Sequence, residues 1–140
     1  MSEANDPVFK GVIPYLSVLG AGAASQFYQK AFGAKELRVM PAEDGKRFMH
    51  IHLEINGGSL MLSDAFPESG YAHQPSHSFT MQLVVPDLDV WWKRAVDAGG
   101  TPTSEPQLMF WGDYWGALVD PFGVHWAFNQ PAEQPAEQPA

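Results

Sequence analysis

The chain has 140 residues, no cysteine, and a formal net charge of −8 from 16 Asp and Glu against eight Lys and Arg. This length, with a hydrophobic content of 45%, predicts a single compact domain with a substantial core. The composition excludes disulfides, thiol catalysis and thiolate metal sites, and the few scattered cations disfavour nucleic acid as a partner. No stretch approaches the roughly 20 apolar residues that a membrane span needs. We therefore expect a cytoplasmic protein whose acidic field suits a neutral or cationic small ligand better than a polyanion.

The elements predicted in chain order form two similar halves. The first half reads as a strand at residues 12–18, a helix at 21–32, and strands at 35–40, 47–55 and 59–64. The second half reads as a strand at 78–85, a helix at 88–98, and strands at 107–111, 114–119 and 125–129. The single domain is therefore expected to span residues 8–130, with modules at about 11–66 and 77–130.

Three segments outside these elements are expected to be less ordered. Residues 1–10 read as a loose leader, and the Pro, Gly and Ser-rich connector at 66–77 reads as a mobile loop between the halves. The tail at 131–140 repeats PAEQ, and this Pro-rich, polar composition predicts disorder because it cannot bury a core.

The two predicted helices differ in how clearly the sequence marks their ends. Asp87 is a good N-cap for the second helix, and Gly99 and Gly100 end it. The first helix has a weaker start, because Gly20 and Gly22 stand there. The halves nevertheless align as a weak internal repeat, which pairs Leu16 with Leu83, Val18 with Val85, Ala31 with Ala98 and Gly33 with Gly100.

The stretch WGDYWGALVDPFGVHWAF, residues 111–128, reads as two short strands joined by the turn residues DPFG. It resembles the closing hairpin of the vicinal oxygen chelate superfamily, which contains glyoxalases, bleomycin-resistance proteins and extradiol dioxygenases, and it looks most like the PhnB-like branch. The resemblance implies an α+β fold of two βαβββ modules. Each module would curl a mixed or antiparallel sheet, with a helix on its outer face, and the modules would form a cavity.

Strand alternation sorts side chains between the helix face and the cavity face of each sheet. Met49, Ile51, Leu53 and Ile55 should face the helix, whereas His50, His52 and Glu54 should face the cavity. In the last strand Trp126 and Phe128 should lie in the core. The predicted ligand-binding residues are the polar and aromatic side chains of the cavity and its mouth: Tyr15, His50, His52, Gln82, Trp111, Tyr114, Trp115 and His125.

The resemblance also implies where a metal would bind. Superfamily enzymes take four metal ligands from the first and last strands of each half, and these positions hold Ile13, Met61, Thr80 and Ala127. None of the four is a competent ligand for a divalent transition metal. We therefore expect no metal site and no cofactor. A less favoured alternative is a divalent metal held by His50, His52 and Glu54, which share one strand face.

Two hypotheses about function remain open. The first is a non-enzymatic binder of small organic molecules, of the bleomycin-resistance type, with aromatic side chains that stack on the ligand. The second is a lyase or isomerase whose catalytic candidates are His50, His52 and Glu54, with or without a divalent metal. A homodimer is expected from the habit of the superfamily. The sequence does not decide the ligand, or whether the cavity lies within one chain or between two.

Overall fold

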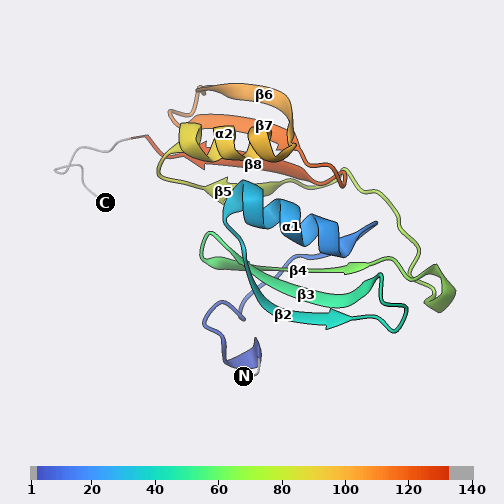
Figure 1. Cartoon of the computed structure of the whole chain (residues 1–140). Helices are drawn as coiled ribbons and strands as arrows, with labels where there is room; N and C mark the ends of the chain where they lie inside the picture. The colour runs from blue at the N-terminus through green and yellow to red at the C-terminus, as the bar shows by residue number, and fades with distance from the viewer. Residues whose placement is uncertain (1–2, 133–140) are drawn as a thin grey trace.

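The computed structural model describes residues 3–132 and shows an α+β fold of two βαβββ modules (Figure 1). The first module contains β1 (Tyr15–Val18), α1 (Ala21–Phe32), β2 (Lys35–Pro41), β3 (Phe48–Ile55) and β4 (Gly58–Asp64). The second contains β5 (Met81–Val84), α2 (Leu88–Ala98), β6 (Thr101–Leu108), β7 (Tyr114–Val119) and β8 (His125–Gln130). Short 3-10 turns lie at Glu3–Asn5 and Pro67–Ser69. The predicted fold class and both helix ranges are confirmed. Of the tail at 131–140, only the first two residues fall within the described residues.

Each module forms its own four-stranded sheet, and neither sheet closes. The strand orders are β1-β4-β3-β2 and β5-β8-β7-β6, with β1·β4 and β5·β8 parallel and the other pairs antiparallel. One helix covers one face of each sheet, and the two helices pack against each other, so that α1 lies between the sheets (Figure 1). The opposite face of each sheet is left without a helix. Within residues 3–132, no helix has the length and apolar character to cross a bilayer.

The helix faces of both modules meet in one hydrophobic core. Phe32 of α1 packs on Trp126 of β8 with ring centroids 4.5 Å apart, and Tyr28 lies 5.3 Å from the same indole. The carboxylate of Asp120 is also buried there. Its Oδ2 accepts hydrogen bonds from the Tyr28 hydroxyl at 2.6 Å and from Nε1 of Trp126 at 2.9 Å. The prediction that Trp126 and Phe128 belong to the core is confirmed, since each is at most 2% exposed.

The last strand of each module caps the helix of the same module. Oδ1 of Asp64, at the end of β4, accepts hydrogen bonds from the backbone N–H groups of Gly20 and Ala21 at 2.8 and 3.0 Å. Oε1 of Gln130, at the end of β8, accepts one from the N–H of Leu88 at 2.8 Å. The weak start of α1 in the sequence is thus explained, because its capping side chain lies 44 residues away.

The sixth strand differs from its predicted range. It runs from Thr101 to Leu108, and not through 107–111, although it contains Pro102 and Pro106. Proline is tolerated because β6 is the edge strand of its sheet, and its pairing with β7 shifts register between Pro102 and Ser104 and again before Gln107. The residues that follow, with Trp111, form a turn in which the N–H of Gly112 bonds to the carbonyl of Met109.

The start of β3 also departs from strict alternation. Met49 was expected on the helix face with Ile51, but it is 54% exposed. The pairing of β2 with β3 shifts register between Met40 and Pro41, and Phe48 takes the place on the helix face. Its ring packs so closely on α1 that a Cβ added to Gly22 would lie 2.7 Å from Cε1 of Phe48. Gly22 therefore weakens the helix signal in the sequence but makes room for this ring.

Trp126 and Trp111 should respond very differently to truncation. Trp126→Ala removes a side chain that is 2% exposed and should lower the free energy of unfolding by about 3–5 kcal/mol. Trp111→Ala removes one that is 46% exposed and should cost much less. Chemical denaturation of both variants measures the two losses. Equal, large losses would contradict the placement of Trp111 at the surface.

Candidate functional site

The open face of the first sheet carries three of the predicted ligand-binding residues. Tyr15 projects from β1, and His50 and His52 project from β3 on the same face. The Tyr15 hydroxyl lies 2.9 Å from Nδ1 of His50, so the two side chains form a hydrogen-bonded pair. Glu54, the third catalytic candidate, lies further along β3, with Lys35 opposite it in β2.

The N-terminal segment is docked on this face and is not the loose leader that the sequence predicts. Oε2 of Glu3 lies 3.1 Å from Nε2 of His50 and 2.9 Å from Nδ1 of His52. Oε1 of the same carboxylate lies 4.0 Å from Nε of Arg38. The ring of Phe9 packs edge-on against His52, with centroids 5.9 Å apart. Beneath this cover the side chain of His52 is 0% exposed.

Both ring nitrogens of His52 have a hydrogen-bond partner. The Ser59 hydroxyl donates to the carbonyl of Val8, at 2.5 Å. Nε2 of His52 lies 2.8 Å from the same hydroxyl oxygen, and Nδ1 faces the carboxylate of Glu3. The buried imidazole of His52 is thus held between Ser59 and Glu3.

Two opposing effects act on the pKa of Glu3. Burial raises the pKa of this carboxyl, but hydrogen bonds and charge interactions with His50 and His52 outweigh burial and lower it below its usual value. Glu3 is therefore ionised at neutral pH, as its role as an acceptor from both imidazoles requires.

A groove of about 1020 Å³ lies on the same side of the first module. It is lined by side chains of β1, β3 and β4 and of the loops beside them: Tyr15, Ser17, Arg47, Met49, Ser63, Phe66, Glu68 and Tyr71 are among them. Arg47 holds one wall in place, since Nη2 contacts Oε2 of Glu68 at 2.6 Å and Nε contacts Oδ2 of Asp44 at 2.7 Å. Its guanidinium also lies 4.3 Å from the ring centroid of Phe66. Because Tyr15 lines the groove and bonds to His50, the groove and the histidine pair adjoin.

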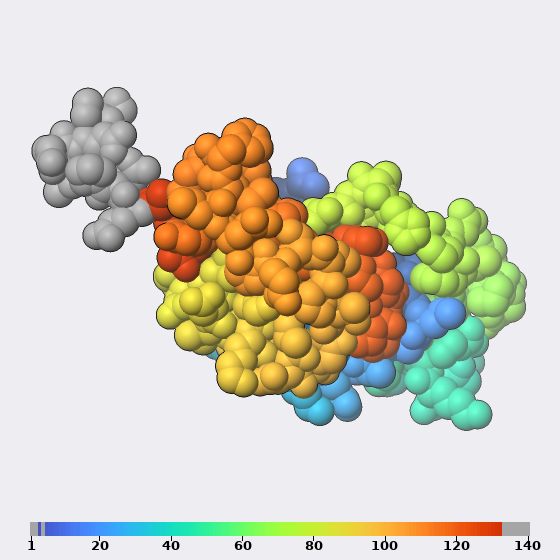
Figure 2. All heavy atoms as spheres, turned by 90° about the horizontal axis from the view of Figure 1, so that it is seen from above, coloured from blue at the N-terminus to red at the C-terminus, as the bar shows by residue number. Residues whose placement is uncertain are grey.

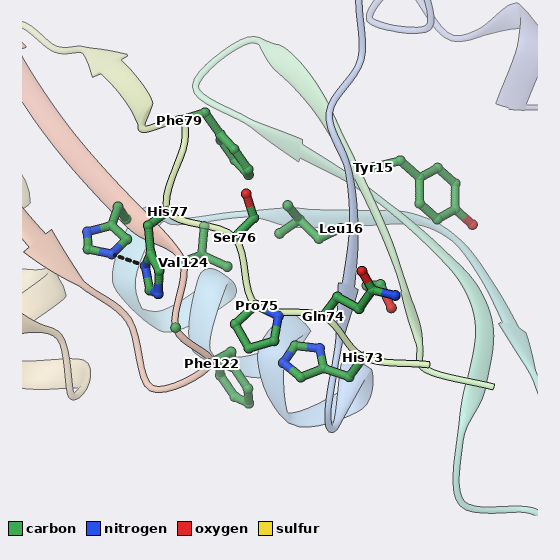
Figure 3. Close-up of a pocket in the computed structure, with 13 residues that line it drawn as sticks. Tyr15, Leu16, His73, Gln74, Pro75, Ser76, His77, Phe79, Phe122 and Val124 are labelled. Atoms are coloured by element: carbon green, nitrogen blue, oxygen red, sulfur yellow. Dashed lines mark hydrogen bonds between the residues drawn. The ribbon is translucent and has the colours of Figure 1, made fainter. Parts of the chain in front are cut away.

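A smaller cavity of about 300 Å³ lies where the connector crosses β1 and the β7–β8 turn (Figure 3). In the space-filling view the connector rests against the C-terminal strands (Figure 2). Nδ1 of His77 in the connector lies 3.2 Å from Nε2 of His125 in β8. Figure 3 shows Phe122 beneath Pro75, whereas the ring of Tyr15 points away from this cavity. The connector thus contacts β8 through His77, and its Pro75 lines the same cavity as Phe122.

The remaining predicted ligand-binding residues gather on the second module. Nε1 of Trp115 donates to Oε1 of Gln82 at 3.4 Å, which links β7 to β5. Trp111, in the turn after β6, packs edge-on against Trp115 with centroids 6.3 Å apart. Tyr114 is 45% exposed at the start of β7. The predicted set is therefore divided between the two modules: Tyr15, His50 and His52 on the first, and Gln82, Trp111, Tyr114, Trp115 and His125 on the second.

The four positions at which the resemblance implies metal ligands lie in or just before strands of both modules. Ile13 and Thr80 precede β1 and β5, while Met61 and Ala127 are buried in β4 and β8. Among residues 3–132, no group of three or more His, Cys, Asp or Glu is placed to hold a metal ion.

Residues 16–128 match the Glyoxalase/Bleomycin resistance protein/Dioxygenase superfamily. The chain belongs to this superfamily. It is 39% identical over 127 residues to the uncharacterised protein Rv0887c of Mycobacterium tuberculosis, covering 86% of this chain and 74% of that protein. It is 30% identical to the protein YjdN of Escherichia coli, covering 86% of this chain and 95% of YjdN.

Solved structures share the fold. Protein PA1353 of Pseudomonas aeruginosa superposes with a TM-score of 0.73 at 24% identity, over 89% of this chain and 99% of that one. A PhnB protein of Bacillus cereus superposes with a TM-score of 0.64 at 16% identity, over 86% and 99%. A PhnB protein is thus among the structures that have the same fold as this chain.

Sequence reasoning found the two histidines of the first sheet but missed the groups that face them. Strand alternation placed His50 and His52 on one face, as the structure does. Glu3 lies in a segment without periodicity, and Arg38 lies on a strand whose polar residues do not alternate cleanly, so neither carried a signal. The role of Glu3 can be recognised only from its distances to the two imidazoles.

The contact of Glu3 predicts how the leader responds to acid. Because the pKa of this carboxyl is lowered in the folded protein, its contribution is present above the ordinary carboxyl pKa and is lost as pH falls through the folded value. Protonation of Glu3 in acid removes the negative charge that faces His50, His52 and Arg38. Amide NMR shifts of residues 3–9 should therefore report leader release below about pH 4, while core amides stay unchanged. The same transition in a Glu3→Gln variant would contradict this origin.

Proposed function

We propose that this member of the superfamily is a non-enzymatic binder of small organic molecules, that it lacks the superfamily metal, and that it acts as a homodimer in the cytoplasm. The observation that carries the proposal is the pair of open sheet faces, which present aromatic rings and hydrogen-bonding side chains where metalloenzymes of the superfamily present metal ligands. Sites for organic ligands combine apolar walls with a few polar groups in this way.

The groove of the first module supports this proposal. Its volume of about 1020 Å³ is at the upper end for a drug-sized ligand. Tyr15, Phe66, Tyr71 and Met49 supply apolar and aromatic surface, and the serines supply hydroxyls. On the second module, Trp111 and Trp115 offer ring surface on which a planar or cationic ligand can stack.

The alternative is a lyase or isomerase that uses the His50, His52 and Glu54 face, with or without a divalent metal. The observation that favours it is the Tyr15 to His50 hydrogen bond, which joins two side chains able to transfer protons. The carboxylate that lies between the two imidazoles is that of Glu3. Glu54 lies further along β3, opposite Lys35. Turnover of a ligand identified by binding, abolished by His50→Ala, would favour the enzyme over the binder.

A ligand screen by thermal shift, with elemental analysis of the same sample, tests the proposal. We expect less than stoichiometric transition metal after purification without added metal, and a raised Tm with an aromatic organic ligand. Trp111→Ala should weaken the binding of a planar ligand by about 1–3 kcal/mol if stacking holds that ligand.

About one Zn, Ni, Mn or Fe per chain retained through dialysis would refute the metal-free proposal. Retention of that metal in a His50→Ala, His52→Ala double variant would place it away from these histidines.

A second expected outcome concerns assembly. Phe110 is 95% exposed and Leu108 is 60% exposed beside the edge strand β6, and such apolar side chains next to an open edge favour contact with a second copy. Light scattering at micromolar concentration should give the mass of a dimer. The monomer mass would refute the dimer. A Phe110→Asp variant should shift the equilibrium toward monomer if this edge is the contact, whereas Val12→Asp, a fully exposed site on the other module, should not.

A further inference from the structure

Three nitrogen groups on the open face of the first sheet converge on a single carboxylate. His50 and His52 of β3 contact Oε2 of Glu3 at 3.1 and 2.9 Å, and Arg38 of β2 approaches Oε1 at 4.0 Å. Arg38 and His52 are directly paired across the two strands, so the strand register fixes the spacing of these nitrogen groups. The carboxylate comes from the leader, whereas the groups that receive it come from a regular sheet.

The sheet side of this contact is built for an anion. The side chain of His52 is fully buried, and each of its ring nitrogens lies within hydrogen-bonding distance of an oxygen: Nδ1 faces Glu3 and Nε2 faces Ser59. A buried polar nitrogen without a partner is unfavourable, so this face favours a carboxylate or another acceptor in the place of Glu3 whenever it is closed from water. Tyr15, which bonds to the far nitrogen of His50, orients that imidazole toward the same point.

The leader side of the contact is replaceable. Residues 6–14 form no strand with the sheet. The N–H of Met61 in β4 bonds to the carbonyl of Pro14 at 3.0 Å, and before that point the leader contacts the sheet through Glu3, the Val8 carbonyl and the ring of Phe9. Segments with so few backbone and apolar contacts open at low free-energy cost compared with core elements. Displacement of Glu3 would leave the sheet, and the site on it, intact.

The groove beside the site indicates what else the ligand contains. Tyr15 bonds to His50 and also lines the groove, where Met49, Phe66 and Tyr71 provide apolar surface. A ligand with a carboxylate on the histidines and an apolar or aromatic body in the groove would use both. A net charge of −8 disfavours polyanions, so one carboxylate fits better than several.

We propose that Arg38, His50 and His52 bind the carboxylate of a small organic acid, and that Glu3 occupies this site until such an acid displaces it. This inference rests on the proposed function as a small-molecule binder and specifies the ligand class and a self-inhibiting leader. While Glu3 occupies the site, the acid can bind only to those molecules in which the site is free. The apparent affinity for the acid is therefore lowered in proportion to that fraction.

The experiment compares the full-length protein with Glu3→Ala in NMR titrations with 3-phenylpropionate. The neutral 3-phenylpropionamide has the same body without the charge and serves as the ligand control. Glu105→Ala removes an exposed carboxylate from β6 on the other module and serves as the protein control for the change in net charge. Glu3→Gln, which keeps the size of the side chain, is the second variant should Glu3→Ala perturb the fold. The signals followed are the imidazole resonances of His50 and His52 and the amides of Val8 and Phe9.

If the inference is correct, Glu3→Ala binds 3-phenylpropionate at least about tenfold more tightly than the unaltered protein or Glu105→Ala. The imidazole signals of His50 and His52 shift, the amide analogue gives no such shift, and adding Arg38→Ala to Glu3→Ala weakens the acid again. In the unaltered protein, saturation with the acid moves the Val8 and Phe9 amides to their positions in Glu3→Ala.

Equal affinity in all three proteins, or equal affinity for acid and amide, would overturn the inference. Binding that shifts the Trp111 and Trp115 signals but leaves His50 and His52 unmoved would overturn it while supporting the proposed function. Failure of every compound in the thermal-shift screen, including this acid with Glu3→Ala, would remove the inference and the proposed function together.

Discussion

The carboxylate of Asp120 holds the two modules in one structure. Its Oδ1 accepts hydrogen bonds from the backbone N–H groups of Phe122 and Val124, and its Oδ2 accepts from Trp126 and Tyr28. Three of these donors belong to the β7–β8 hairpin, whereas Tyr28 belongs to α1 of the other module. Burial, and the Asp120 carboxylate beside it, raise the pKa of Tyr28 well above its usual value, so the hydroxyl keeps the proton that it donates. A single buried carboxylate side chain thus joins the hairpin turn, the indole of Trp126 and α1.

This arrangement determines which surfaces are left for binding. The two helices pack on each other and on the sheet faces that carry core side chains such as Trp126. The opposite face of each sheet is therefore not part of this core. Alternation then places Tyr15, His50 and His52 on one open face and Gln82 and Trp115 on the other. The chain presents two surfaces of similar topology and different chemistry, one with imidazoles and a carboxylate, the other with indoles and an amide.

Local sequence signals were sufficient for the helices and most strands, because these depend on periodicity and on glycine and proline positions. They failed where a distant part of the chain decides the local structure. Proline in β6 is acceptable only at a sheet edge, and the exposure of Met49 follows from a register shift against β2. The helix cap that Gly20 cannot supply comes from Asp64. None of these can be read from neighbouring residues.

The same limit applies to the site. The net charge of −8 predicts a field that suits a neutral or cationic ligand better than a polyanion. At the first sheet, however, His50, His52 and Arg38 all face one point, so electrostatics there are set by the few groups within hydrogen-bonding distance and not by the sum over the chain. In this structure the chain places a carboxylate of its own leader at that point. A ligand that contacts both His50 and His52 there would have to displace Glu3, so the leader and the site have to be considered together.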